Sequence, residues 1–437
     1  MKKLEAFMEK HLMPYAVKIG SIKGLIAIRD GVALAMPLII IGSVFLIIGS
    51  FPIEEWTNFI GGLMDGRISA ALTHATNSSF GIMGLVGAFG IARSMAEQYN
   101  VDGASAGVIS VSAWLILTPN IVSDLGEGVP VTYLGSRGLF IAILVGLLSA
   151  WVFQWFVNRN IVIKMPEGVP PAVSKSFVAL IPGAIILLVA IAASLIIETF
   201  FDNAHELLAT VLAGPLGILG GSLFGAILTV FLNSAFWFMG IHGGNIVGSV
   251  TGPIFLANTD ANRLALQAGE PLPEIFTSQF FDLFAYLGGG GAVMGLAFAI
   301  LFFGKSAQSK AMKGVGVVPN LFNISEPLMF GMPIMFNMLY LIPFVIAPVV
   351  NVIITYFAMV TGLLSRTIGI AVPWTTPPII SGWLATGDWT GPLWQIILLV
   401  VDMLIYLPFF LMSDKRQLVT EQVASGNDTT EESSVEK

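Results

Sequence analysis

Residues 31–51 read GVALAMPLIIIGSVFLIIGSF, a run without a charged side chain. A helix of roughly 20 predominantly apolar residues is long enough to cross the hydrocarbon core of a bilayer. The sequence is therefore predicted to be an all-α polytopic membrane protein. Further apolar runs follow at about 80–98, 103–120, 137–157, 175–200, 288–304 and 391–412.

The composition predicts the same class. Of the 437 residues, 55% are hydrophobic and 11% are charged, and the mean hydropathy is +0.85. A soluble globular chain carries about 25% charged residues, so lipid must be the solvent for most of this surface. There is no cysteine, and the four histidines lack metal-ligand spacing, so we expect neither metal nor cofactor. The absence of a basic patch with interleaved aromatics argues against a nucleic-acid partner.

Lysine and arginine are concentrated in alternate loops between the apolar runs. Basic residues precede the first run, end the second at Arg93, separate the fourth from the fifth, and follow the last two. Acidic residues such as Glu54 occupy the other loops. Because positive loops stay in the cytoplasm, both termini are predicted to be cytoplasmic. The charged stretch 1–29 is predicted to form an amphipathic surface helix and not a cleavable signal.

The distribution of polar motifs divides the chain into three parts. Residues 1–200 hold five regular spans with few internal polar groups, as expected of a scaffold. Residues 201–412 are interrupted by Gly, Pro, Asn and Trp and hold nearly all the polar motifs at membrane depth, as expected of a transport domain. Residues 413–437 form a largely polar segment that we expect to be a disordered tail.

The first polar motif is 231–245, FLNSAFWFMGIHGGN, which contains Asn233, Trp237, His242 and Asn245. Unpaired backbone groups cost several kcal/mol each in hydrocarbon, so a glycine-rich break is tolerated only against protein or a water-filled cavity. We therefore predict a re-entrant segment that lines a polar substrate site. The alternatives are a hydrogen-bonded core histidine at a span end and a tryptophan of the interfacial belt.

The second motif is 319–333, PNLFNISEPLMFGMP, which contains Asn323, Ser325 and Glu326. A carboxylate among apolar residues at membrane depth is a functional candidate by default. The two flanking prolines prevent a plain helix, so a helical hairpin with a tip is predicted. The alternative role for Glu326 is to cap a helix.

Two weaker motifs complete the candidate site. Trp374 and Thr375 lie in 372–378, VPWTTPP, where aromatic faces beside hydroxyls suit sugar rings, although belt tryptophans would give the same pattern. Asn77 precedes the second span, where it could reach the site from the other half or act as a helix N-cap.

These groups favour a neutral, hydroxyl-rich substrate such as a sugar. There is no array of intramembrane basic residues for an anion, and no Walker-type phosphate loop. The rival readings are a cation-coupled sugar symporter, a membrane scaffold or receptor, and an enzyme acting on lipid-linked sugars. The symporter is disfavoured by the apparent lack of a second buried carboxylate or a basic partner, and the lipid-linked enzyme by the lack of an Asp/Glu pair for a metal.

The sequence resembles the membrane-embedded enzyme IIC of the bacterial phosphoenolpyruvate-dependent sugar phosphotransferase system, in its lactose/cellobiose/diacetylchitobiose branch. The resemblance covers about residues 1–415 and looks closer to the chitobiose/cellobiose side. It is carried by Met13-Pro14 through Arg29-Asp30-Gly31 into Pro37, by Trp237-Phe-Met-Gly-Ile-His242-Gly, and by Asn323-Ile-Ser325-Glu326-Pro327.

The resemblance implies about ten membrane spans, two re-entrant helical hairpins and amphipathic helices, in a homodimer built mainly by the N-terminal half. It implies a permease of the bacterial inner membrane that moves a β-linked disaccharide, while a separate IIB protein, charged by IIA, donates the phosphoryl group. Whether the permease subunit is itself counted as an enzyme stays open. By similarity, Glu326 would bond the accepting sugar hydroxyl and His242 would assist, with Trp237, Trp374 and Asn77 near the sugar; either Glu326 or His242 could be the base.

Overall fold

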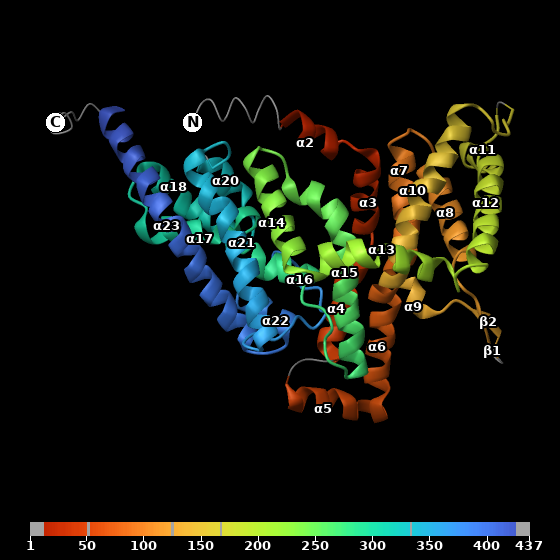
Figure 1. The fold of residues 1–437 in the computed structure, drawn as a ribbon, viewed down its shortest axis with the longest axis horizontal. Coiled ribbons are helices and arrows are strands. Elements are labelled where there is room, and N and C mark those ends of the chain that lie inside the picture. Colours follow the sequence, from red (N-terminus) through yellow and green to blue (C-terminus); the bar gives the residue numbers. More distant parts are fainter. Residues whose placement is uncertain (1–12, 50–52, 124–125, 167, 333, 425–437) are drawn as a thin grey trace.

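The computed structural model describes residues 13–49, 53–123, 126–166, 168–332 and 334–424. The regular secondary structure of these residues is almost entirely helical (Figure 1). The two strands among them, β1 (Ile121–Ser123) and β2 (Gly126–Gly128), form one short antiparallel hairpin with Ile121 opposite Gly128. The predicted all-α polytopic class is confirmed.

Within the described residues, six helical stretches are long and apolar enough to cross a membrane. A seventh is added if the bent pair Ser278–Ala292 and Met294–Phe303, which turns through 63°, is one span. Shorter apolar helices lie beside them, so the ten-span count stays a prediction. The six are Lys23–Gly49, Glu55–Glu97, Ser136–Asn158, Pro171–Glu198, Met338–Thr361 and Thr390–Val423.

The N-terminal helices form one packed group, coloured red to yellow in Figure 1. Its core is made of small and branched side chains around Trp114, which is fully buried. Its elements are α2 (Met13–Gly20), α3 (Lys23–Ala33), α4 (Met36–Gly49), α5 (Glu54–Gly62), η2 (Leu63–Gly66), α6 (Arg67–Ser79), η3 (Phe80–Ile82), α7 (Met83–Glu97), α8 (Gly103–Ile116), α9 (Val131–Leu134), α10 (Ser136–Asn158), α11 (Pro171–Val178) and α12 (Leu180–Glu198).

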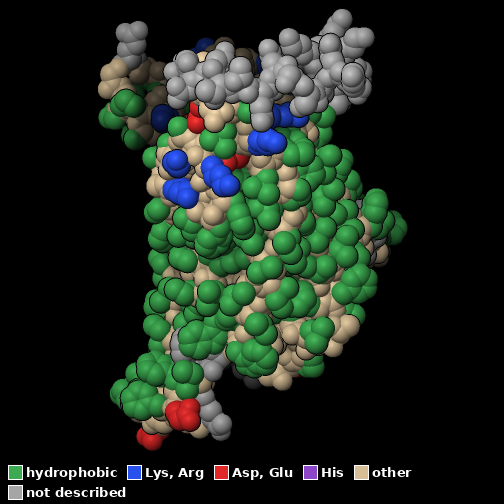
Figure 2. Space-filling view, turned by 90° about the vertical axis from the view of Figure 1, so that its left-hand side faces the viewer, with side chains coloured by type: hydrophobic (Ala, Val, Ile, Leu, Met, Phe, Trp, Pro, Cys, Tyr) green, Lys and Arg blue, Asp and Glu red, His purple; other side chains and the backbone are tan. Residues whose placement is uncertain are grey.

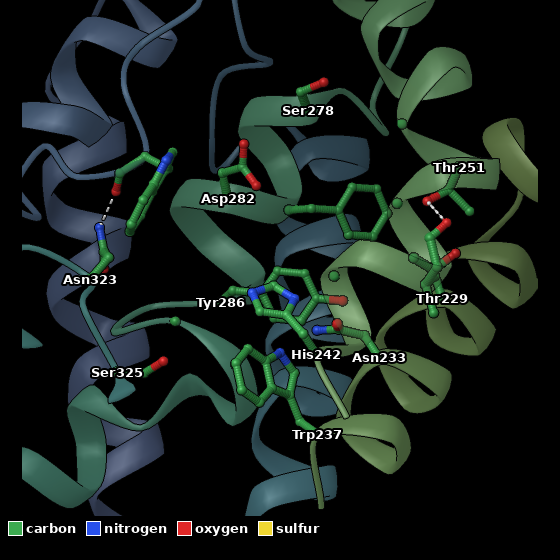
Figure 3. Close-up of a pocket in the computed structure, with 18 of the residues that line it drawn as sticks. Thr229, Asn233, Trp237, His242, Thr251, Ser278, Asp282, Tyr286, Asn323 and Ser325 are labelled. Carbon is green, nitrogen blue, oxygen red and sulfur yellow. Dashed lines mark hydrogen bonds between the residues drawn. The ribbon is translucent and has the colours of Figure 1, made fainter. Parts of the chain in front are cut away.

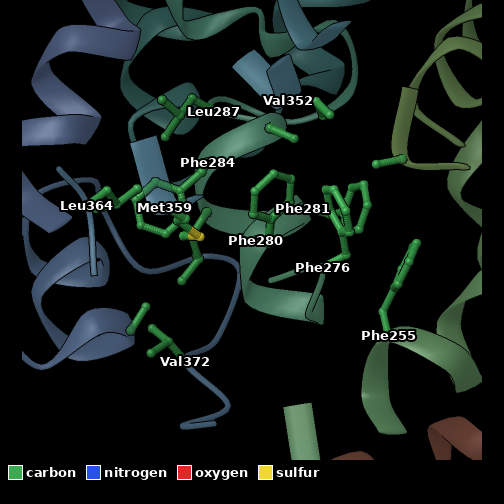
Figure 4. Close-up of a cluster of buried hydrophobic side chains, with 14 of the residues drawn as sticks. Phe255, Phe276, Phe280, Phe281, Phe284, Leu287, Val352, Met359, Leu364 and Val372 are labelled. Carbon is green, nitrogen blue, oxygen red and sulfur yellow. The ribbon is translucent and has the colours of Figure 1, made fainter. Parts of the chain in front are cut away.

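The C-terminal helices form a second group around a phenylalanine-rich core (Figure 4). In this core, the rings of Phe255 and Phe281 stack with centroids 4.1 Å apart. Its elements are α13 (Ala204–Gly221), α14 (Leu223–Phe238), α15 (Gly243–Ala268), α16 (Ser278–Phe280), the π-helix η4 (Phe281–Ala285), η5 (Gly290–Ala292), α17 (Met294–Phe303), α18 (Ala307–Val315), α19 (Val317–Asn320), α20 (Glu326–Gly331), α21 (Met338–Thr361), α22 (Ile380–Thr386) and α23 (Thr390–Ala424).

A buried ion pair joins the two groups. Arg263 and Asp260 on α15 are each 2% exposed, and Arg263 Nη2 lies 2.7 Å from Asp260 Oδ1. Arg263 Nη1 donates to Asn77 Oδ1 on α6 at 2.8 Å, and the Ser136 hydroxyl on α10 donates to Asp260 Oδ2 at 2.6 Å. Neither charge is left unpaired, and both groups contribute to the network.

Two boundary predictions need correction near the N-terminus. The N-cap alternative for Asn77 is wrong, because Asn77 lies inside α6, and the N-cap of α7 is Ile82 without a side-chain bond. The low hydropathy of 67–79 hid this helix, which continues the chain into α7. The predicted helix 1–29 is split between α2 and α3, and residues 1–12 lie outside the described residues.

The predicted disordered tail also begins too early. Helix α23 continues through Ala424, so residues 413–424 are helical, and residues 425–437 lie outside the described part. The extension is held by acidic side chains that accept backbone N–H bonds at the start of α18. Asp414 accepts from Lys305 at 2.9 Å and Glu421 accepts from Ala307 at 2.9 Å. Carboxylates at a helix N-terminus satisfy free N–H groups and complement its dipole.

Asp102 joins α8 to α11 and gives the fold an acid-sensitive contact. It caps α8 by accepting from Ser105 N at 2.9 Å and pairs with Lys175 Nζ at 2.9 Å. Burial raises its pKa, but the bonds from Ser105 and Lys175 outweigh burial and hold the pKa at about 2. The pKa of an Asp in an unfolded chain is about 3.9. The contact should therefore stabilise the fold at neutral pH and lose that effect as the pH falls toward 2.

We therefore expect Asp102→Asn to lower the thermal midpoint at pH 7 and to differ less from the native protein as the pH approaches 2. Asn still caps a helix, so the variant isolates the charge. Thermal unfolding of the detergent-solubilised protein across this pH range measures the effect. The control is Asp30→Asn, which removes a carboxylate from the exposed pair with Arg29. A constant difference between Asp102→Asn and the native protein at every pH would contradict the assignment.

Candidate functional site

A pocket of about 360 Å³ opens within the C-terminal group (Figure 3). Its walls come from α14, α15, the bent segment 278–292, the start of α20 and the loop after α21. The chain thus brings together three motifs that are far apart in sequence. The predicted residues that line it are Asn233, Trp237, His242, Asn323, Ser325, Glu326 and Trp374.

His242 is positioned by the break between two helices. Helix α14 ends at Phe238, Gly240 takes the left-handed conformation with φ +76°, and His242 then caps α15. Glycine meets that backbone requirement without a steric penalty. The break turns the imidazole toward Trp237, and the two ring centroids are 4.3 Å apart.

The cap also defines which imidazole nitrogen is free. The backbone N–H of Asn245 donates to His242 Nδ1 at 3.2 Å. Since Nδ1 accepts, the proton of a neutral imidazole must be on Nε2. The group that His242 can present to a ligand is therefore an N–H donor.

Glu326 begins α20 directly after a left-handed turn at Asn323, whose φ is +60°. It occupies the first turn of the helix, as in the capping alternative, but its side chain also lines the pocket. Glu326 and Arg29 on α3 both interact electrostatically with the His242 ring. The pocket therefore contains a carboxylate acceptor and an N–H donor within each other's electrostatic reach.

Asn323 lines the pocket but uses its amide to hold the wall together. Its Oδ1 accepts from Gly288 N at 2.7 Å, and its Nδ2 donates to the carbonyl of Trp374 at 2.5 Å. One side chain thereby fixes both the glycine turn and the loop that carries the tryptophan. A second lone pair on Oδ1 remains for a substrate hydroxyl, so the structural role does not exclude a substrate contact.

The glycine run 288–291 is a feature that sequence reasoning missed. A Cβ on Gly289 would lie 2.7 Å from Ser325 Oγ, and one on Gly290 would lie 2.9 Å from the Trp237 ring. Gly289 also has φ +92°. The backbone must approach both neighbours this closely to close the pocket wall, so only glycine fits. Four consecutive glycines in an apolar stretch could have indicated this close approach of the backbone.

Asp282 and Tyr286 are further pocket residues that were not predicted. They lie on the π-helical turn η4 and just after it, and the Tyr286 hydroxyl points toward the Asn233 amide (Figure 3). Asp282 is accessible from the pocket. A π-helical turn in the wall of a pocket is common at functional sites.

These observations correct the expectation that only one carboxylate is buried. Asp282 joins Glu326 in the pocket, Asp260 is paired with Arg263, and Asp402 on α23 is 0% exposed. Single acids inside long apolar runs were overlooked because neither neighbours nor spacing marked them. The number of carboxylates at membrane depth therefore does not distinguish this chain from a cation-coupled symporter.

Three predicted residues do not line the pocket. Asn245 lies one turn beyond His242 on the exposed side of α15, and Thr375 follows Trp374 outside the lining set. Asn77 accepts its bond from Arg263 in the ion-pair network. Asn77 does not line the pocket, so the structure does not show the predicted contact from the other half.

Comparisons with known proteins point to one family over nearly the whole chain. The family model "Phosphotransferase system, EIIC" matches residues 29–348. The lichenan permease IIC component of Bacillus subtilis (strain 168) is 46% identical, with 96% of each chain covered. The cellobiose-specific EIIC component of Geobacillus stearothermophilus is 44% identical, with 97% of each covered.

A solved structure agrees with the sequence comparisons. The crystal structure of the transporter ChbC, the IIC component of the N,N′-diacetylchitobiose-specific phosphotransferase system, superposes with a TM-score of 0.91. It is 42% identical in sequence, and the match covers 95% of this chain and 99% of ChbC. With its polytopic helical fold and its pocket between broken helices, the chain belongs to the EIIC family of phosphotransferase-system permeases.

Proposed function

We propose that this permease transports a β-linked disaccharide of the cellobiose or diacetylchitobiose type across the bacterial inner membrane, coupled to its phosphorylation by a phosphorylated IIB partner. The observation that carries the proposal is the pocket in which Glu326, His242 and Trp237 meet. Aromatic faces bind the apolar faces of sugar rings, and polar tips bind their hydroxyls. The names of the lichenan, cellobiose and diacetylchitobiose relatives support this substrate class.

In the proposed reaction, the accepting sugar hydroxyl attacks the phosphorus of phospho-IIB. A new oxygen–phosphorus bond forms as the bond from phosphorus to the IIB side chain breaks, and the hydroxyl proton passes to the Glu326 carboxylate. Phosphoryl transfer depends mainly on positioning and charge stabilisation. A carboxylate within hydrogen-bond reach of the hydroxyl is a suitable general base.

The tautomer of His242 supports assigning the base to Glu326. With Nδ1 engaged by Asn245 N, the free Nε2–H is a donor. It would bond a sugar oxygen or a phosphoryl oxygen and could not also remove a proton. Arg29 on α3 interacts electrostatically with the His242 ring, and we propose that it supplies a positive charge for the incoming phosphoryl group.

The wider architecture supports a cytoplasmic position for both termini, and the homodimer built mainly by the N-terminal half stays an expectation from the family resemblance. Lys and Arg gather at one end of the molecule, above a broad hydrophobic belt (Figure 2), and α2 and the end of α23 lie at that end (Figure 1). By the positive-inside rule this end is cytoplasmic. Movement of the 201–412 part past the N-terminal scaffold would carry the sugar site across the membrane.

Vesicle uptake of labelled β-disaccharides, with and without phosphorylated IIB, tests the proposal. We expect accumulation of phosphorylated sugar only when phosphorylated IIB is present, because added charge traps the product behind the apolar belt. Unphosphorylated IIB is the matched control. A cation-coupled symporter would instead accumulate unmodified sugar in response to a proton or sodium gradient, and that result would overturn the proposal.

A further inference from the structure

The bent segment 278–292, which supplies one wall of the pocket, leaves backbone carbonyl groups outside regular helix. Within a membrane, such groups must find partners inside the protein, because lipid offers none. Three of these carbonyls, on Leu283, Ala285 and Gly291, receive hydrogen bonds from side chains on two neighbouring helices, α21 and α23. The segment therefore depends on side chains that do not touch the pocket.

Helix α23 supplies most of these partners through one buried stripe. Gln395, Asp402 and Tyr406 are separated by seven and four residues, so they share one face of the helix, and each is 0% exposed. Gln395 Nε2 donates to Leu283 O at 2.8 Å, and the Tyr406 hydroxyl donates to Gly291 O at 2.6 Å. The two bonds hold the segment at its π-helical turn and at the last residue of the glycine run.

Asp402 lies between these two contacts and acts through Asn351 on α21. Asn351 Nδ2 is 3.1 Å from Asp402 Oδ2 and 3.4 Å from Ala285 O. Asp402 Oδ1 and Asn351 Oδ1 have no hydrogen-bond partner among the described residues. No described Lys, Arg or His pairs with Asp402.

These contacts offer an ionised Asp402 one hydrogen bond and no cation, which suits a neutral carboxylic acid better. An isolated ionised carboxylate in an apolar interior costs so much free energy that the group becomes protonated instead. Protonation of Asp402 removes this cost, and the Asn351 amide, as placed, still donates to Asp402 Oδ2 and to Ala285 O.

We propose that Asp402 is held as the neutral acid in the membrane and that, with Asn351, Gln395 and Tyr406, it positions the 278–292 segment for sugar binding. The proposal rests on the proposed sugar site, because Asp282, Tyr286 and Gly290 of the pocket wall belong to this segment. Trp237 packs directly on Gly290, so a shift of the segment would move the tryptophan face as well.

Two substitutions of Asp402 test its protonation state. Asp402→Asn preserves a neutral polar group of the same shape, whereas Asp402→Leu leaves the Asn351 amide without its partner. We expect Asp402→Asn to keep native sugar affinity and Asp402→Leu to weaken it roughly tenfold or more. Equal loss in both variants would show that the native side chain is ionised, as in a bound-cation site, and would overturn the proposal.

A spectroscopic signal tests the same point without any sugar. The native protein in lipid should show the infrared carbonyl stretch of a protonated carboxyl group at neutral pH. The Asp402→Asn variant should lack this band, so the band should appear in the native-minus-variant difference spectrum. Absence of that band from the native protein refutes the neutral acid. Because this readout needs no transport, it separates failure of the proposal from failure of the proposed sugar function.

Paired tyrosine variants test positioning and avoid changing a charge. Tyr406→Phe removes the donor to Gly291 O and should weaken sugar binding about two- to tenfold, while phosphorylation at saturating sugar changes little. Tyr340→Phe is the matched control, because its buried hydroxyl makes no hydrogen bond to the segment in the described structure. Equal effects of the two variants on sugar binding, or an effect of Tyr406→Phe on the saturated rate alone, would contradict the positioning role.

Discussion

Glu326→Gln is expected to lower the rate of sugar phosphorylation by about 10²–10⁴-fold, the range that a positioned general base contributes. Gln keeps the shape of the side chain and can still bond a sugar hydroxyl, but it cannot accept the proton. Sugar affinity should therefore change far less than the phosphorylation rate. Equilibrium binding of the disaccharide and phosphoryl transfer from phosphorylated IIB, measured separately on the purified protein, give the two quantities.

Two variants make the result specific to the site. Glu97→Gln removes a carboxylate from an exposed pair with Arg93 and should leave both quantities unchanged. His242→Gln removes the imidazole but keeps an N–H donor near the same position, so it should retain more activity than Glu326→Gln. If Glu326→Gln phosphorylates sugar at the native rate while His242→Gln does not, the base is His242 and the tautomer argument is wrong.

The parts of this site that could be predicted are local in sequence. Trp237, His242 and Glu326 stand out because polar residues beside glycine and proline interrupt apolar runs. Such breaks are expensive in a membrane, which is why they identify the broken helices and most of the pocket. The class of fold follows from the same physics, since only lipid accommodates so apolar a chain.

The features that escaped prediction depend on contacts between distant positions. The structural bonds of Asn323 were missed because its partners Gly288 and Trp374 are 35 and 51 residues away in sequence. The bond between Asn77 and Arg263 was missed because the two residues are 186 positions apart. Asp282 and Asp402 are both single acids in apolar runs. Only tertiary packing shows that Asp282 lies in the pocket wall and Asp402 in the protein interior.

The second large effect is expected at the junction between the two helical groups. Arg263→Met should destabilise the protein by about 3–5 kcal/mol, because it leaves the Asp260 carboxylate buried without its cation. The Ser136 hydroxyl would still bond Asp260 Oδ2, but one hydrogen bond does not replace an ion pair. Thermal or denaturant unfolding of the solubilised protein measures the loss. Arg93→Met, which breaks the exposed pair with Glu97, is the matched control and should change stability little.

A double variant separates the charge from the network that surrounds it. Arg263→Met with Asp260→Asn removes both charges, and most of the lost stability should return, because a buried pair contributes little net free energy beyond its own desolvation. If the double variant is as unstable as the single one, the bonds to Asn77 and Ser136 hold the groups together, and the uncompensated charge is not the cause. Restored stability without restored uptake would instead show that transport needs the charged pair itself, which sets the relative position of α15, α6 and α10.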